Sequence, residues 1–243
     1  MRTLAILPVK RFDAAKHRLA GVLGAGSRQA LAQAMFLDVL ASLRHVDAID
    51  DVLVVTSDPV AEAAAGSYRI AVLRDTGAGQ STAASFGLGH PLARRAHRAL
   101  LVPGDVPLLD PVEVAEWLEV ARREPVDLRI VPDRHGAGTN ALLIEPPDAF
   151  GPAFGAGSLE RHTDRARAAG LDVRVDHVPS LLRDVDTPED LAEVWSVLDE
   201  RRGLAPHTRG ALRQLDRARV TGSAEMARVR DRVRAADVPR WST

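Results

Sequence analysis

Short apolar runs alternate along this chain with segments in which apolar residues recur every three or four positions. Such runs are typical of strands buried on both faces, and the wider spacing is typical of helices with one buried face. The runs predict strands at residues 4–9, 51–56, 70–73, 98–102, 128–131, 140–144 and 173–178. The wider spacing predicts helices at residues 27–40, 61–65, 82–96, 111–121, 159–169 and from 187 onward.

This alternation predicts the fold class. Strands that take turns with helices favour an α/β fold with a doubly wound, mostly parallel sheet, and we expect one strand to be antiparallel. Ligands of such sheets bind outside the carboxyl ends of the strands. The informative loops are therefore those at residues 8–18, 75–82, 103–107, 133–139 and 183–187.

Two of the predicted helices begin at residues that commonly cap helices. Ser27 precedes the apolar positions of the first helix and is expected to be its N-cap. Thr187 is expected to cap the last helix of the core, with Pro188 at its first position and Asp190 as the acid of a capping box.

The end of the chain differs from the rest. Gly203 and Pro206 interrupt the helical pattern, and an Arg- and Ala-rich stretch follows. Its apolar positions, among them Leu212, Leu215 and Val220, suit one or two amphipathic helices. We therefore expect a domain over residues 1–202 and a helical extension over 203–243. The sequence leaves open whether Trp195 and this tail form the contact face of a homodimer.

Composition removes several classes of function. The formal net charge is -1, so no overall basic field favours nucleic acid. The chain has no cysteine, which excludes disulfides, thiolate zinc sites and a cysteine nucleophile. No apolar run approaches the roughly 20 residues that span a bilayer, and the run at residues 4–9 is too short for a signal peptide. We expect a cytoplasmic protein with neither membrane nor nucleic acid as partner.

A basic loop follows the first predicted strand. It carries Lys10, Arg11, Lys16 and Arg18. Basic side chains at a strand end can neutralise a triphosphate, although a solvated surface loop would have the same composition. The loop lacks the GxxxxGK[ST] pattern of a P-loop, and no GxGxxG follows the first strand, which counts against a dinucleotide-binding domain.

Acidic residues follow two other predicted strands. Asp105 ends the apolar run at residues 98–102, between two prolines, where a carboxylate can hold Mg²⁺ or simply stabilise a turn. Asp184 and Asp186 alternate in an extended segment and so share a face. They could complete a metal site with Asp105, or Asp186 could serve only the dipole of the helix that follows.

Glycine-rich loops supply a further candidate for binding an anion. Thr139 follows Gly138, and Ser158 follows Gly155-Ala156-Gly157 at the start of a predicted helix. Backbone N–H groups of such loops and of helix N-termini favour a phosphate or a carboxylate, although ordinary capping uses the same residues. The eight histidines show no metal-ligand spacing and are expected to lie mostly at the surface, and no GxSxG motif indicates a hydrolase.

Taken together, these segments resemble the 2-phospho-L-lactate/phosphoenolpyruvate guanylyltransferases of coenzyme F-420 biosynthesis, which are MobA-like nucleotidyltransferases. The resemblance covers roughly residues 1–200. It is carried by residues 8–10, 15–19, 54–58, 102–109, 138–142, 154–159 with His162, and 184–191. It implies a nucleotide-diphospho-sugar transferase (glycosyltransferase-A-like) fold, and transfer of GMP from GTP to a small phosphorylated three-carbon acid with release of pyrophosphate.

The resemblance also assigns roles to residues. Thr139, Gly155 and Ser158 would hold the phosphoenolpyruvate or phospholactate. Asp105, joined by Asp184 or Asp186, would bind Mg²⁺. Lys16 and Arg18 would act on the triphosphate. The nucleotide would lie against Pro8, Lys10, Lys16, Gly79 and Ser81. The Arg- and Ala-rich composition looks actinobacterial, and phosphoenolpyruvate is the acceptor expected for such members.

One departure from the family keeps other functions open. The family usually has asparagine in the turn before the third helix, and this chain has Ser81 there. A MobA-like transferase that uses CTP, or GTP with another acceptor, is one alternative. A nucleotide-binding module without catalysis is another, and a glycosyltransferase is compatible with the fold alone.

Overall fold

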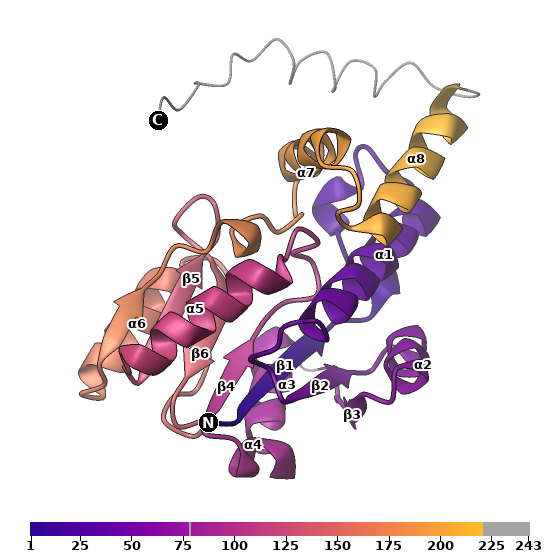
Figure 1. Ribbon diagram of the computed structural model, residues 1–243. Helices are drawn as coiled ribbons and strands as arrows, with labels where there is room; N and C mark the ends of the chain where they lie inside the picture. The colour runs from indigo at the N-terminus through magenta and orange to yellow at the C-terminus, as the bar shows by residue number, and fades with distance from the viewer. Residues whose placement is uncertain (78, 221–243) are drawn as a thin grey trace.

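The computed structural model describes residues 1–77 and 79–220, and one sheet of seven strands organises them (Figure 1). The strands run in the spatial order β3-β2-β1-β4-β6-β5-β7. Their bounds are β1 Thr3–Val9, β2 Asp51–Thr56, β3 Ala71–Arg74, β4 Arg98–Leu101, β5 Leu128–Pro132, β6 Thr139–Ile144 and β7 Val173–Val175. Strand β6 pairs antiparallel with β4 and β5, and the other pairs are parallel. The predicted sheet, with one antiparallel strand, is confirmed.

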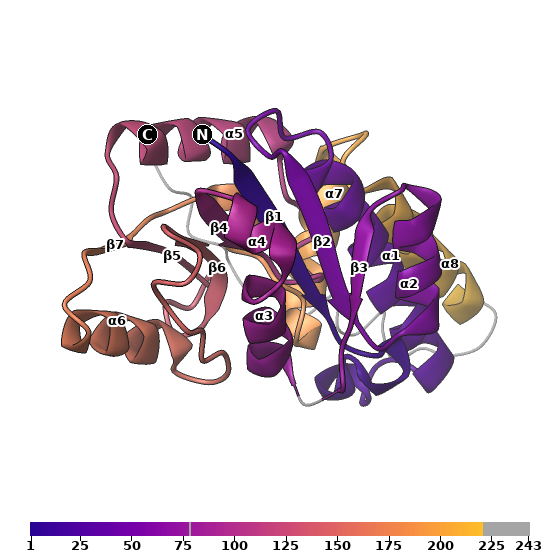
Figure 2. The same ribbon diagram turned by 90° about the horizontal axis from the view of Figure 1, so that it is seen from below.

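Helices cover both faces of this sheet. They are α1 Ala25–Leu43, α2 Pro59–Ser67, α3 Gln80–Leu88, α4 Pro91–Arg95, α5 Pro111–Arg123, α6 Ser158–Ala168, α7 Pro188–Glu200 and α8 Pro206–Val220. Short 3-10 helices cover Phe12–Ala14, His17–Leu19 and Pro179–Leu181. Apolar residues of α1, α2 and α5 pack on one face, and those of α3, α4 and α6 pack on the other. Figure 2 shows α5 and α6 on opposite sides of β5 and β6.

Three predicted elements differ from the structure. Helix α1 begins at Ala25 with Gly24 as its N-cap, so Ser27 lies inside the first turn. The predicted helix over 82–96 is two helices, because Pro91 cannot continue α3 and instead starts α4, with His90 as the N-cap. The predicted strand over 173–178 ends at Val175, beyond which the chain turns toward the 3-10 helix at Pro179.

The described part of the C-terminal segment packs on the core. Helix α8 lies along α1, as Figures 1 and 2 both show. Its Leu212 is buried in a cluster with Leu31 and Met35 of α1. The buried carboxylate of Asp38, in α1, accepts hydrogen bonds from the backbone N–H groups of His207 (3.1 Å) and Thr208 (2.7 Å). One amphipathic helix is thus present, and residues 221–243 lie outside the described residues.

Within the described residues, no helix combines the length and apolarity needed to cross a membrane.

Candidate active site

The basic loop after β1 is held in place by a buried carboxylate. Asp58 accepts a hydrogen bond from the backbone N–H of Phe12 at 2.8 Å. It also caps α2 by accepting from Val60 N (2.8 Å) and Ala61 N (3.1 Å). Phe12 is itself buried against Phe36 of α1, with ring centroids 5.7 Å apart. Asp58 was not among the predicted site residues, although its position before Pro59 is typical of an N-cap.

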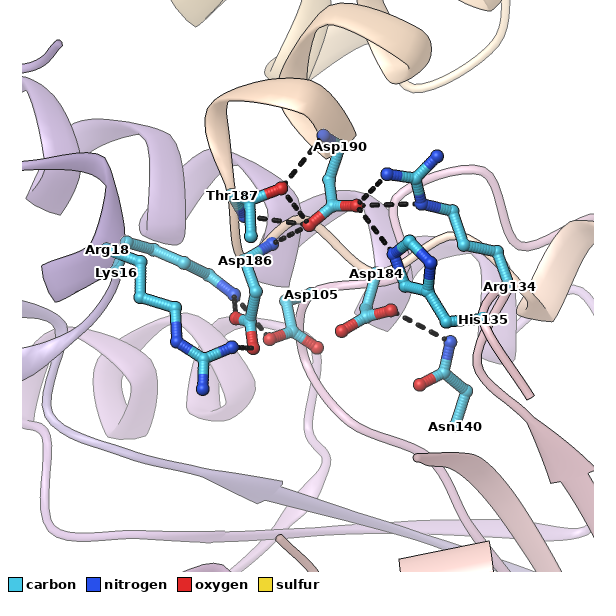
Figure 3. A network of polar contacts seen from close by, with 10 residues as sticks. All are labelled: Lys16, Arg18, Asp105, Arg134, His135, Asn140, Asp184, Asp186, Thr187 and Asp190. Atoms are coloured by element: carbon cyan, nitrogen blue, oxygen red, sulfur yellow. Dashed lines mark hydrogen bonds and ion pairs between the residues drawn. The ribbon is translucent and has the colours of Figure 1, made fainter. Parts of the chain in front are cut away.

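Lys16 joins the basic loop to the acidic residues. Its side chain is only 5% exposed, and its ammonium lies 2.5 Å from Asp105 Oδ2 and 2.9 Å from Asp186 Oδ1 (Figure 3). Burial alone would lower the pKa of Lys16, but the charges of Asp105 and Asp186 outweigh it and raise that pKa. Lys16 is therefore a cation held between two carboxylates. Arg18 lies farther out, with its Nη1 3.8 Å from Asp186 Oδ2 and its side chain 72% exposed.

Asp184 lies on the other side of Asp105 from Asp186 (Figure 3). One of its oxygens accepts a hydrogen bond from Asn140 Nδ2 at 3.2 Å. Burial, followed by the charge of Asp105, raises the pKa of Asp184 to about 7. The backbone N–H of Val185 donates to the carbonyl oxygen of Asp105 at 3.2 Å, so main-chain pairing brings these acids together. The predicted cluster of three acids is present.

The start of α7 fixes the backbone of this cluster. The predicted capping box is confirmed, because the Thr187 side chain accepts from Asp190 N and Asp190 accepts from Thr187 N. Asp190 Oδ2 also accepts from the backbone N–H of Asp186 at 3.0 Å. Its Oδ1 accepts from Arg134 Nε at 2.8 Å, which ties the loop between β5 and β6 to α7. Arg134 and Asp190 therefore support the acids from behind.

Two adjoining cavities open beside the basic loop. The larger, about 310 Å³, is lined by Lys16, Arg18, Asp105 and Asp186 among others. The smaller, about 190 Å³, is lined mainly by the loops after β1 and β3, including Asp75, Gly77 and Gly79. Both share a wall made of Pro8, Val9, Lys10, Ala14 and Gln80. The sequence-predicted nucleotide residues Pro8, Lys10, Lys16 and Gly79 thus all line one cavity or both.

The residues predicted to hold the acceptor, together with Ser81 and Asp184, do not line either cavity. Thr139 Oγ1 lies 3.1 Å from His162 Nδ1, and His162 Nε2 accepts from the backbone N–H of Ala153 at 2.8 Å. Ser81 Oγ accepts from Phe154 N at 2.9 Å, which connects the start of α3 to the glycine loop before α6. Thr139, Ser81, Gly155 and Ser158 line neither cavity.

His162 corrects the expectation that histidines lie at the surface. It is fully buried between the ring edges of Phe150 and Phe154. Burial lowers its pKa to about 4, so the ring is neutral at pH 7. Since Nε2 accepts from Ala153 N, Nδ1 carries the proton and donates to Thr139 Oγ1. A histidine that joins two predicted substrate loops could have been noticed only from its place in the resemblance.

The acid cluster of Asp105, Asp184 and Asp186 offers the kind of ligand atom that Mg²⁺ binds. Mg²⁺ prefers oxygen ligands and usually takes one or two carboxylates and completes its shell with waters and substrate phosphates. Asp105 and Asp186 already enclose a cation, the Lys16 ammonium. Among the described residues no group of three or more acids or histidines is arranged to hold a metal ion. Asp105 and Asp186 are thus two carboxylates of the type and number that Mg²⁺ usually takes from a protein.

Comparison with known proteins identifies the family of this chain. A family model described as "Guanylyl transferase CofC like" matches residues 3–230. The chain belongs to this guanylyltransferase family. A phosphoenolpyruvate guanylyltransferase of Conexibacter woesei is 48% identical over 216 residues, which cover 88% of this chain and 97% of that protein. A 2-phospho-L-lactate guanylyltransferase of Methanothermobacter thermautotrophicus is 35% identical over 216 residues, which cover 88% and 92%.

The fold of this family member also occurs in solved structures. A Desulfovibrio desulfuricans protein described as a nucleotide-diphospho-sugar transferase aligns with a TM-score of 0.71 and 19% identity, covering 89% of this chain and 96% of that one. Similarity at this level of identity concerns the fold alone. It confirms the predicted nucleotide-diphospho-sugar transferase fold, and the family match confirms the predicted nucleotidyltransferase activity.

Proposed function

We propose that this guanylyltransferase transfers GMP from GTP to phosphoenolpyruvate and releases pyrophosphate. The observation that carries the proposal is the buried Lys16 cation between Asp105 and Asp186, at the wall of a cavity that the basic loop also lines. Such a site offers positive charge to a triphosphate and oxygen ligands to a divalent cation. Phosphoenolpyruvate is preferred over phospholactate because the relative of 48% identity is named for it and that of 35% is named for phospholactate.

The chemistry is an in-line displacement at the α-phosphorus of GTP. A phosphate oxygen of the acceptor forms the new bond to that phosphorus. The bond from the phosphorus to the oxygen that bridges to the β-phosphate breaks, and pyrophosphate leaves with that oxygen. The attacking oxygen is already ionised at pH 7, so no strong general base is needed. Catalysis then consists mostly of positioning and charge neutralisation.

The basic and the acidic residues of the site have different roles in this reaction. Lys16 and Arg18, with Lys10 at the shared wall, neutralise the triphosphate and the departing pyrophosphate. Asp105, with Asp184 or Asp186, would hold Mg²⁺, which when bound supplies positive charge to the phosphate oxygens. The phosphates of a bound GTP would offer the Lys16 ammonium new partners, and Asp105 and Asp186 would then be available to hold Mg²⁺.

The acceptor is proposed to bind toward α6. The glycine loop has positive φ at Gly155 (121°) and Gly157 (67°), backbone that glycine adopts readily and that lets the chain turn tightly before α6. Ser158 follows at the first position of α6, whose N-terminus favours an anion. Thr139 is held beside this loop through His162. This arrangement supports the roles predicted for Thr139, Gly155 and Ser158.

A pyrophosphate-release assay tests the proposal. The protein is incubated with Mg²⁺ and GTP, CTP or ATP, each with phosphoenolpyruvate, with 2-phospho-L-lactate or with no acceptor. Because the products are labile, a downstream deazaflavin acceptor enzyme is added to draw the reaction forward. We expect release that requires both GTP and phosphoenolpyruvate. Release with CTP alone among the nucleotides, or with neither acid, would contradict the proposal. A faster rate with phospholactate would reassign the acceptor. A cytoplasmic location and a homodimer stay predictions.

A further inference from the structure

The smaller cavity contains a carboxylate that the proposed chemistry does not use. Asp75 follows β3, and its backbone N–H donates to the carbonyl oxygen of Thr56 at 3.0 Å, which holds it beside the end of β2. Asp75 is one of the residues that line the smaller cavity. Its Oδ1 is buried and has no hydrogen-bond partner among the described residues. A buried, unpaired carboxylate oxygen is costly, so a ligand that donates to it would remove a substantial penalty.

The basic groups nearby do not satisfy Asp75. Arg74, its neighbour in sequence, pairs instead with Glu62, with Nη2 2.8 Å from Oε1. Arg11 also lines the cavity, but its guanidinium pairs with Asp13 at 2.7 Å. No ion pair joins Lys10 to Asp75 in the part of the chain that the structure describes. Asp75 thus keeps unused hydrogen-bond acceptor capacity at the wall of this cavity.

The position of this cavity suits a nucleobase. It shares the wall at residues 8–10 with the larger cavity, in which Lys16 and Arg18 face the proposed triphosphate. Its volume of about 190 Å³ exceeds the ~150 Å³ that accommodates a benzene ring in an engineered core. Since it adjoins the larger cavity along these shared residues, a base placed in it would have its ribose and phosphates on the side of Lys16.

Among the common bases, guanine matches a lone carboxylate best. Its Watson–Crick edge carries two adjacent donors, the N1–H and the 2-amino group, which can bind the two oxygens of one carboxylate in parallel. Adenine and cytosine each place an unprotonated ring nitrogen at that edge, which a carboxylate repels. Ser81, at the position where the family usually has asparagine, accepts a hydrogen bond from Phe154 N and does not line this cavity, so it takes no part in the contact proposed for Asp75. Ser57 and Gln80 line the cavity as well, but neither side chain offers two acceptor oxygens side by side as a carboxylate does.

We propose that Asp75 is the residue that selects guanine, by accepting hydrogen bonds from its N1–H and 2-amino group. The proposal rests on the guanylyltransferase function above. It goes further by naming the residue that excludes other bases.

A substitution in the protein and a matching change in the base of the nucleotide together test the proposal. In Asp75→Asn the side chain has one acceptor and one donor. Xanthine keeps N1–H but has a carbonyl in place of the 2-amino group, so it matches asparagine. We expect Asp75→Asn to bind GTP roughly 10- to 100-fold more weakly than wild type, the scale of one bidentate base contact, and to gain affinity for xanthosine triphosphate. Inosine triphosphate, which lacks the 2-amino group, should bind wild type more weakly than GTP does.

The measurement is isothermal titration of each nucleotide in Mg²⁺ with no acceptor, followed by the pyrophosphate assay. Binding alone reports on Asp75 even where pyrophosphate release fails, so failure of the proposed function is distinguished from failure of this inference. Asp47→Asn is the matched control, since Asp47 is exposed and lines neither cavity, and it should change nothing. Equal weakening of GTP and xanthosine triphosphate in Asp75→Asn, or no weakening of either, would overturn the proposal.

Discussion

The carboxylate of Asp190 accepts a hydrogen bond from the backbone N–H of Asp186 at 3.0 Å. Asp190 belongs to the capping box of α7, and Asp186 contacts the buried ammonium of Lys16. Asp190, which caps α7, therefore also holds the backbone of Asp186 in the site. Arg134, from the loop between β5 and β6, binds the second oxygen of the same carboxylate and fixes its orientation.

We predict that Asp190→Ala changes both stability and the demand for Mg²⁺. Loss of the cap should lower the free energy of unfolding by about 1–2 kcal/mol, measured by urea denaturation. Release of the Asp186 backbone should raise the Mg²⁺ concentration needed for half-maximal pyrophosphate release. Thr187→Ala is the control, because it removes the cap to Asp190 N but leaves the bond to Asp186 N. Equal Mg²⁺ requirements in the two variants would show that Asp190 acts only on stability.

Asp105→Asn should lower kcat by at least ~100-fold, the scale seen when one charge-stabilising group is removed from an active site. The amide has nearly the shape of the carboxylate, so far-ultraviolet circular dichroism should be unchanged. It still accepts from Lys16 but binds Mg²⁺ poorly. Turnover close to that of the wild type, with the fold intact, would refute the metal-binding role of Asp105.

Lys16→Met should have opposite effects on metal binding and on turnover. Without the ammonium, Asp105 and Asp186 have no cation between them, so Mn²⁺ should bind more tightly in the absence of nucleotide. Pyrophosphate release should fall sharply, because the triphosphate loses a buried positive charge. Electron paramagnetic resonance of free Mn²⁺ measures the affinity. Arg18→Met is the control, since the exposed Arg18 is 3.8 Å from Asp186 and should leave Mn²⁺ affinity nearly unchanged. An unchanged affinity in Lys16→Met would mean that lysine and metal do not compete.

We predict that the free energy of unfolding falls in mild acid because of the buried His162. Burial lowers its pKa from the ordinary 6.5 to about 4, so between these values the unfolded chain binds a proton that the folded chain excludes. The neutral His162 ring makes its full contribution to the free energy of unfolding above pH 6.5. This contribution is lost as pH falls toward 4, at up to about 1.4 kcal/mol per pH unit. Urea denaturation of wild type and His162→Gln across this range measures the effect. The two curves should converge toward pH 4, and parallel curves would contradict the shift.

Much of the fold could be predicted from the sequence, because the signals are local. The apolar runs give the strands, and the sequence Thr187-Pro188-Glu189-Asp190 gives the start of α7. Errors arose where two local signals compete. Ser27 is a good capping residue, yet the helix extends back to Ala25. The amphipathic helix predicted beyond Gly203 is present as α8, but the sequence does not show that a buried Asp38, distant in the chain, caps it.

The site was predictable in its residue types but not in its contacts. Residues that follow strand ends of a parallel sheet gather at one edge, which brought Asp105, Asp184 and Asp186 to Lys16 as expected. Three features depend on tertiary packing: Lys16 is buried between two acids, Asp58 anchors the loop, and Asp75 lines a cavity with one buried oxygen unpaired. No local pattern carries that information.

The position of the label in GTP tests the central claim most directly. The protein is given Mg²⁺, phosphoenolpyruvate and GTP labelled with ³²P at either the α- or the γ-phosphate, and the products are separated without acid. We predict that the α-label joins the acceptor and the γ-label appears in pyrophosphate. Recovery of the γ-label as inorganic phosphate, or of the α-label as free GMP or GDP with unlabelled acceptor, would contradict GMP transfer by this site.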